Sequence, residues 1–291
     1  MTKELVTQAR HDPAHVLAPG LFKSIKRGDR KGKNLDITYQ HGDISLRFAG
    51  AWQLGSEDLR VLQGVAAMAT ASKAVIDLDT PQNERSKQLV MLLEPRNQNA
   101  KENAAAIKTS LQRLMREIGY KADGGKNRAQ VIESLRRLAN VTTYVKAGQK
   151  ETSSHLLSYF VDEESGHLVI ACNPRLTKAI IGDQFTLIDM REVRALSSGP
   201  ARLLHQRLSG VVDPAKSRPL KLDTLLSYIW PDPVPSTSSA IRERRKTLRD
   251  VMKELTDTGG WAFTPKGDDQ FVVFRQKAGY HVMDTNGTTA P

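Results

Sequence analysis

The sequence contains very little cysteine and no long apolar run. Cys172 is its single cysteine among 291 residues, so no internal disulfide can form. The longest uncharged stretch, around residues 61–72, is far shorter than the roughly 18 apolar residues that a membrane-spanning helix needs. The first twelve residues, MTKELVTQARHD, also lack the apolar segment of a signal peptide. We therefore expect a protein of a reducing cytoplasm with no membrane partner.

Motifs for catalysis and for metal or cofactor binding are also missing. The stretch GDRKGK at residues 28–33 is close to a phosphate-binding loop, but its second glycine comes one residue early, and Asn34 stands where that loop needs Ser or Thr. His11 and His15 are four residues apart, but Pro13 lies between them and no further zinc ligands cluster nearby. We therefore predict no enzyme activity, no catalytic residue, no metal site and no cofactor.

Positive charge is what the sequence has in excess. Lys and Arg total 43 against 32 Asp and Glu, which gives a net charge of +11 and favours a polyanionic partner such as nucleic acid. The densest run carries six cations and two glycines, a composition that disfavours a stable helix. It is either a solvated arm or an arm that contacts DNA phosphates. The cations are Lys23, Lys26, Arg27, Arg30, Lys31 and Lys33.

The hydrophobic pattern predicts one order of elements twice. The first pass follows a hairpin around residues 41–43 and comprises helices over 56–69, 103–118 and 127–139, a strand at 141–146, and strands in HLLSYF and HLVIAC. The second pass comprises helices over 201–208, 222–230 and 239–255, followed by a hairpin of WAFTP and FVVFRQ. Ser56 is the expected N-cap of the first of these helices.

This order predicts an α+β fold made of two tandem winged helix-turn-helix domains with a basic N-terminal arm, because helices followed by a β-hairpin are typical of that motif. The expected boundaries are an arm at 1–34, a first domain at 35–182, a second domain at 183–276 and a disordered tail at 277–291.

Charges on the predicted helix 239–255 are sorted by face. Apolar residues from Ile241 to Leu255 cluster on one side, while a second side carries cations at spacings of four, three and four residues. The arrangement predicts a DNA-binding helix, although a solvated helix held by internal ion pairs is the alternative. The predicted DNA-binding residues here are Arg242, Lys246, Arg249 and Lys253, with Arg244 and Arg245 flanking the core face and Lys266 in the following hairpin turn.

The helix at 127–139 has a different outward face. It mixes hydrogen-bond donors and acceptors, which suits base edges, although an ordinary surface helix has the same composition. The residues predicted to face outward are Gln130, Glu133, Ser134 and Arg137. Those predicted to contact phosphates are Lys126, Arg128 and Arg136.

Two long strings resemble a known family. These are RHDPAHVLAPGLFKSIKRGDRKGKNLDITYQHGD at residues 10–43 and EVRALSSGPARLLHQRL at residues 192–208, and LDTLLSYIWP at 222–231 extends the similarity. They resemble the RepC replication initiators of IncQ-type broad-host-range plasmids. The resemblance covers the chain from about Arg10 to Gln276.

This resemblance implies a bacterial, cytoplasmic plasmid replication initiator without ATPase or nuclease activity. Such a protein would bind the directly repeated iterons of the vegetative origin through two winged helices and promote local origin opening, and so bear on plasmid copy number. Its partners would be double-stranded DNA, the plasmid-encoded helicase and primase, and, if the active form is a homodimer, a second copy. Two alternatives remain. One is a winged-helix transcriptional repressor that binds an operator, expected to be an inverted repeat, as a dimer. The other is a DNA nickase or topoisomerase-like enzyme, which would need metal or tyrosine chemistry.

Overall fold

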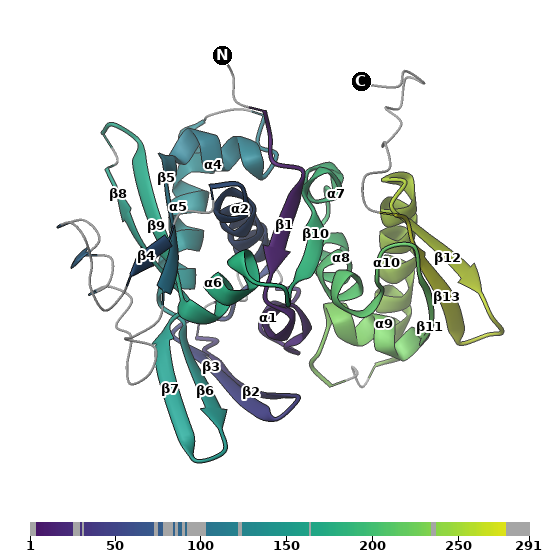
Figure 1. The fold of residues 1–291 in the computed structure, drawn as a ribbon. Helices are drawn as coiled ribbons and strands as arrows, with labels where there is room; N and C mark the ends of the chain where they lie inside the picture. The colour runs from purple at the N-terminus through teal and green to yellow at the C-terminus, as the bar shows by residue number, and fades with distance from the viewer. Residues whose placement is uncertain are drawn as a thin grey trace.

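The computed structural model describes residues 4–25, 30, 32–72, 75–77, 84, 87–88, 91, 103–121, 124–162, 164–233 and 237–277 (Figure 1). The first part of the chain contains β1 (Gln8–His11), α1 (Pro13–Leu17), β2 (Leu35–His41), β3 (Ile44–Gly50), α2 (Ser56–Ser72), β4 (Val75–Asp77), β5 (Asn103–Ser110), α4 (Leu111–Glu117), α5 (Gly125–Ala139), β6 (Thr142–Ala147), β7 (Lys150–His155), β8 (Leu157–Val161) and β9 (His167–Cys172). The second part contains α6 (Pro174–Ile181), β10 (Thr186–Asp189), α7 (Met190–Ala195), α8 (Gly199–Val211), β11 (Ser217–Lys221), α9 (Leu222–Ile229), α10 (Ser238–Asp257), β12 (Trp261–Pro265) and β13 (Gln270–Arg275). The predicted tail lies, from residue 278 on, outside the described residues.

One unit of six elements occurs twice in this mixed α and β fold. The unit has the order helix, strand, helix, helix, strand, strand. It consists of α2, β5, α4, α5, β8 and β9 the first time and of α8, β11, α9, α10, β12 and β13 the second time. In both units these three strands are antiparallel and the last of them lies in the middle, as β5-β9-β8 and as β11-β13-β12. We call them the first and second repeat units. The first unit has one more strand in this sheet, β4, which follows α2 in the sequence and pairs with β5. In the first unit, the β6–β7 hairpin is inserted between α5 and β8 and joins β2 and β3 in a second sheet.

The predicted helix at 103–118 is wrong over its first half, where the chain forms strand β5. Ala104, Ala105 and Ile107 of β5 are buried, and the strand lies between β4 and β9, so its apolar residues do not alternate with polar ones. The helix begins only after Ser110, whose hydroxyl accepts a hydrogen bond from the Arg113 backbone N–H at 3.1 Å. Strand β11 was likewise not predicted.

The N-terminal segment is packed between the two repeat units and does not extend away as an arm. Strand β1 pairs antiparallel with β10, from Gln8 opposite Asp189 to His11 opposite Thr186, and lies beside it in Figure 1. Helix α1 packs against α8 of the second unit. Leu21 and Phe22 are buried in the core. The described residues of 4–25 therefore belong to the folded body, because their apolar side chains fill the space between the units.

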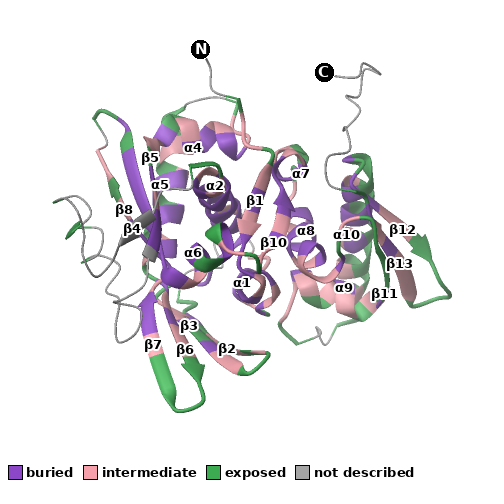
Figure 2. Cartoon of the chain, in the orientation of Figure 1, coloured by how far each residue is buried: buried purple, intermediate pink, exposed green. Residues whose placement is uncertain are grey.

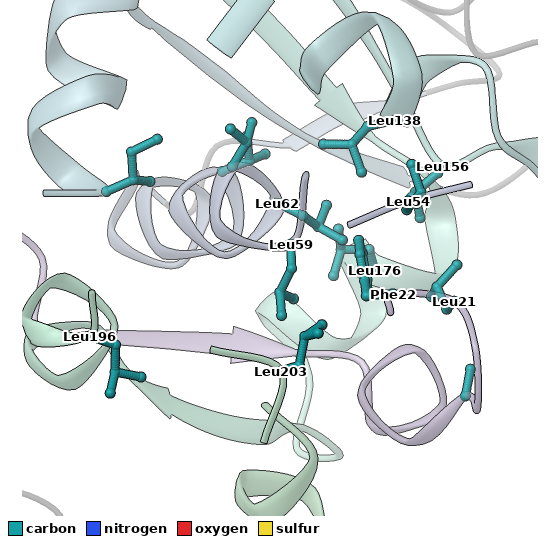
Figure 3. Close-up of a cluster of buried hydrophobic side chains, with 14 of the residues drawn as sticks. Leu21, Phe22, Leu54, Leu59, Leu62, Leu138, Leu156, Leu176, Leu196 and Leu203 are labelled. Carbon is teal, nitrogen blue, oxygen red and sulfur yellow. The ribbon is translucent and has the colours of Figure 1, made fainter. Parts of the chain in front are cut away.

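One hydrophobic core joins both units. Its buried residues come from α2, α4, α5 and β9 as well as from α8, α9, α10 and β13. Figure 3 shows Leu59 and Leu62 of α2 in the same cluster as Leu203 of α8 and Phe22. Figure 2 shows that α2 and α8 are extensively buried, whereas the ends of the β6–β7 and β12–β13 hairpins are exposed. Gly64 of α2 leaves room for the side chain of Ile118, the residue after α4, because a Cβ at position 64 would collide with it.

Two histidines are buried where β1, α1 and α6 meet. His11 and His15 are almost wholly inaccessible, and Asp12 between them caps α1 and pairs with Nε of Arg175 at 2.6 Å. Burial lowers the pKa of His15 to about 4 and also lowers the pKa of His11. Both side chains are therefore neutral near pH 7.

Because these histidines are buried in the neutral form, we expect the free energy of unfolding to fall in mild acid. An unfolded histidine binds a proton near pH 6.5, whereas folded His15 stays neutral until about pH 4, so between these values the unfolded state binds more protons. We expect His15 alone to lower the free energy of unfolding by about 2 kcal/mol between pH 7.5 and pH 5. Urea unfolding at both pH values measures this change.

His15→Leu should reduce that pH dependence by about the same 2 kcal/mol. His167→Gln, at an exposed position of β9, controls for the loss of a histidine as such. An unchanged pH dependence in His15→Leu would show that His15 does not resist protonation.

Candidate nucleic-acid interface

Helix α10 presents a row of exposed cations on the side opposite the core. Thr237 caps the helix, and Leu248, Val251, Met252 and Leu255 are buried against α8, α9 and β12. We call four of the exposed cations the α10 stripe: Arg242, Lys246, Arg249 and Lys253. Arg245 is exposed as well, and so is Lys266 at the β12–β13 turn.

The α10 stripe is not held by ion pairs with the described part of the protein. Among the residues that the structure describes, no carboxylate lies within salt-bridge distance of any of the four stripe side chains. Cations spaced three and four residues apart on one helix face repel one another when none of them is ion-paired, which costs stability and raises the local positive potential. This argues against a helix stabilised by internal ion pairs and favours an external anion as the partner.

The neighbours of the stripe have structural contacts. The Arg244 guanidinium lies over the Trp230 ring, 5.5 Å from its centroid. Glu254 binds the segment before α8, where its Oε1 accepts from the Ser198 backbone N–H at 3.0 Å and its Oε2 from the Ser198 hydroxyl at 2.6 Å. Partial burial alone would raise the pKa of Glu254, but these hydrogen bonds and those from Ser197 keep it below its ordinary value. Because its guanidinium lies over Trp230, Arg244 belongs to the packed side of α10.

Helix α5 occupies the same place in the first repeat unit and has a weaker cationic face. Lys126, Glu133 and Arg136 are exposed, while Arg128 and Gln130 are half-buried. Arg136 forms an ion pair with Glu133 on the same helix. The positive charge available to a ligand is therefore smaller on α5 than on α10.

Two residues of α5 predicted to face outward are turned inward, which corrects the prediction for Ser134 and Arg137. Ser134 is 0% exposed because it lies three residues after buried Val131, on the edge of the apolar stripe. The Arg137 side chain is 15% exposed, and its Nε and Nη2 donate to Asp58 Oδ1 at 2.9 and 2.7 Å. Neither side chain is placed to reach a base edge.

Asp58, in the first turn of α2, gathers three donors from three segments. Its side chain is 0% exposed. Its Oδ2 accepts from the Gly55 backbone N–H and from Arg30 Nη1, both at 2.8 Å, while Oδ1 accepts from Arg137. The helix itself begins at Ser56, so Ser56 is not its N-cap as predicted, and the Asp58 carboxylate binds the N–H of Gly55, the residue before the helix. This site was not predicted, since Asp58 lies 28 residues from Arg30 and 79 from Arg137.

The basic run of the N-terminal segment is partly held within the protein. Lys23 Nζ donates to Asp232 at 2.8 Å, and Arg30 is bound to Asp58. Lys33 lines a groove of about 510 Å³ together with Lys23, Trp230 and Arg244. Lys26, Arg27 and Lys31 lie outside the described residues. Lys23 and Arg30 were predicted to contact DNA phosphates, but both side chains are bound to carboxylates of the protein itself.

A second hollow lies at the C-terminal end of α5 and was also not predicted. It has a volume of about 460 Å³ and is lined by Trp52, Arg136, Asn140, His155 and Tyr159, among others. Trp52 is 43% exposed. Exposed aromatic side chains beside an arginine are common at binding surfaces.

The described residues offer neither a metal cage nor a membrane span. Among them, no group of three or more His, Cys, Asp or Glu side chains could hold a metal ion. No helix in that part of the chain is long and apolar enough to span a bilayer.

Comparison with known proteins identifies the family. No curated protein matches the sequence. Among solved structures, the crystal structure of selenomethionine derivatives of domain 2 and domain 3 of RctB has a similar fold, with a TM-score of 0.55 and 9% identity, over 91% of this chain and 98% of that chain. The family model of replication protein C (RepC) matches residues 3–277, nearly the whole chain. The chain therefore belongs to the RepC family of replication proteins.

Proposed function

We propose that this protein is a plasmid replication initiator whose two repeat units are winged helix-turn-helix domains that bind origin DNA. The observation that carries the proposal is the α10 stripe, a row of exposed cations that form no ion pair with the described residues, on the third helix of the second unit. In a helix-turn-helix the helix after the turn enters the major groove, and β12 and β13 would form the wing. Membership of a replication protein family supports DNA at an origin as the polyanion.

The two units would then read successive major grooves. Helix α5 holds the position in the first unit that α10 holds in the second, so one monomer would cover two half-sites about 10 to 10.5 base pairs apart. The half-sites would differ in sequence, because α10 presents the cationic stripe and α5 a mixed face. A non-palindromic site of this kind suits iterons, which are direct repeats.

The contacts divide into two classes. The α10 stripe, with Arg245 and Lys266, would supply the main contacts, and Gln130, Glu133 and Arg136 of α5 would face the other groove. Lys126, Arg128 and Lys33 would contact phosphates. The initiator would bend the iteron array, promote opening of an adjacent segment and admit the plasmid-encoded helicase and primase, with no enzymatic step of its own.

Selection of bound sequences from random double-stranded DNA tests the proposal. Full-length protein is used, and light scattering gives the stoichiometry of the selected complexes. A non-palindromic site of about 20 base pairs bound by one monomer is the expected result. A palindrome bound by a dimer would instead identify a repressor, and protection of only one half-site by the monomer would overturn the two-groove geometry.

A further inference from the structure

We propose that Asp250 of α10 reads a cytosine of the DNA, by accepting a hydrogen bond from the N4 amino group of that base in the major groove. This inference rests on the proposed function and deepens it, because a base can be read only if α10 enters the groove. It gives a role to a carboxylate that would weaken DNA binding by its charge alone.

Asp250 lies on the side of α10 that faces away from the protein. The buried side chains of the helix run from Leu248 to Leu255 and all point toward the core. At 100° per residue, the direction opposite to them passes between positions 246 and 250. Lys246 and Asp250 are both exposed. A hydrogen-bond donor and an acceptor therefore stand about one helical turn apart at the middle of the outward face.

The Asp250 side chain has no contact with the part of the protein that the structure describes. Among those residues, none forms a hydrogen bond or an ion pair with its carboxylate. Lys246 precedes it by four residues and Lys253 follows it by three, positions from which ion pairs on one helix can form, yet neither does so here. An ionised carboxylate only accepts hydrogen bonds, so Asp250 is available to a donor outside the protein.

The other carboxylates on this side of α10 have different surroundings. Glu254 accepts hydrogen bonds from the Ser198 backbone N–H and hydroxyl at 3.0 and 2.6 Å. Glu243 lines the groove of about 510 Å³ beside the N-terminal segment. Asp257 is the last residue of the helix and lies beyond the α10 stripe. Asp250 differs from all three because it faces outward within the length of the stripe.

The chemistry of the major groove selects cytosine as the base. A carboxylate repels phosphates, which lowers the affinity for every DNA, but this repulsion becomes selectivity where a base offers a donor. The donors in this groove are the N4 amino group of cytosine and the N6 amino group of adenine. Adenine presents the N7 acceptor beside its amino group and thus suits Asn or Gln, whereas cytosine suits Asp. Lys246 suits the acceptors of guanine, so Lys246 and Asp250 together match a G·C pair.

Sequence selection with full-length D250A tests this assignment. Asp250 is exposed and has no described side-chain contact, so the variant is expected to fold, which circular dichroism checks. The preference for G·C at one position of the selected site should fall by roughly 5- to 30-fold, while binding to random DNA rises because a repulsive charge is removed. The matched control is D213A, at an exposed position between α8 and β11, which should select the wild-type site.

The variant D250N gives a result that a merely structural role of Asp250 would not give. An amide can accept from adenine N6 and donate to adenine N7 at the same time. D250N should therefore prefer adenine at the position where the wild type prefers cytosine. A wild-type base preference at every position in D250A or D250N overturns the reading of a base by Asp250.

A change in the DNA alone tests the hydrogen bond itself. The assigned cytosine is replaced by pyrimidin-2-one, a base that lacks the N4 amino group. This replacement should weaken binding of the wild type roughly 5- to 30-fold more than binding of D250A, because only the wild type loses the contact. Equal weakening of both proteins overturns the contact.

The two levels of the proposal fail in different ways. If the wild type selects no preferred sequence, the proposed function fails, and the role of Asp250 fails with it. If the wild type and D250A select the same site with the same preferences, sequence-specific DNA binding stands and only the reading of cytosine by Asp250 is wrong.

Discussion

The variant R242Q/K246Q/R249Q/K253Q is expected to bind its selected DNA roughly a thousandfold more weakly than the wild type does. Each stripe residue is exposed and forms no ion pair in the described part of the chain, so its replacement removes a DNA contact and relieves repulsion on the helix. If each contact contributes about 1 kcal/mol, four contacts give about a thousandfold. Fluorescence anisotropy at fixed ionic strength measures the change.

A second variant with the same loss of charge separates contact from general attraction. K108Q/K146Q/K150Q/K216Q removes four exposed cations from β5, the β6–β7 hairpin and the connection before β11. It should retain binding within about tenfold, because none of these cations lies on α5 or α10. At 0.1 M salt, a cation farther than a Debye length of about 10 Å from the DNA phosphates is largely screened from them. Equal weakening in both variants, or unchanged preference for the selected site in the stripe variant, would show that α10 does not read DNA.

The salt dependence of the stripe variant distinguishes phosphate contacts from base contacts. The slope of log affinity against log salt should become shallower by about 0.9 for each phosphate that the variant no longer neutralises. A stripe residue that reads a base lowers the preference for the selected site over random DNA when it is replaced, and leaves that slope nearly unchanged. Single replacements at Arg242, Lys246 and Arg249 therefore assign each residue to one class.

The stripe could be predicted because its signal is local. An amphipathic helix sorts residues by a repeat of 3.6, so the sequence places the cations and the apolar residues on separate faces whatever the rest of the chain does. The predicted span of 239–255 differs from α10 by one residue at the start and two at the end. The hairpins around residues 41–43 and 266–269 were predicted for the same reason, since turn residues and alternation mark them locally.

The interior contacts could not be predicted because they join distant parts of the chain. The helical pattern places Arg137 away from the apolar stripe, but a long side chain reaches Asp58 from there, and nothing near Arg137 in the sequence indicates that carboxylate. Similarly, the density of charge between Lys23 and Lys33 predicts an arm, either solvated or in contact with DNA phosphates, whereas pairing of β1 with β10 holds the N-terminal segment against both units. Strand β5 is misread because a central strand buried on both faces loses its alternation.

Replacing Asp58 is expected to have the largest effect on stability. D58N deprives Arg137, which is 15% exposed, and the partly buried Arg30 of the carboxylate that they share. Removal of one partner from a buried ion pair costs about 3 to 5 kcal/mol, because the remaining charge stays desolvated. Urea unfolding followed by circular dichroism should show this loss, and D36N at the exposed Asp36–Arg47 pair should change the free energy of unfolding by less than about 1 kcal/mol.

A thermodynamic cycle decides whether the ion pair, and not the shape of Asp58, carries this stability. Once Arg137 is replaced by Met, the carboxylate keeps Arg30 as its charged partner, so D58N in the R137M background should cost at least about 1 kcal/mol less than D58N in the wild type. If the two costs are equal, Asp58 acts mainly as the acceptor for the Gly55 N–H that begins α2. If D58N costs less in the R137M background, the ion pair between Arg137 and Asp58 fixes the orientation of α5. Arg137, which was predicted to contact DNA bases, would then hold in place the helix that we propose contacts DNA.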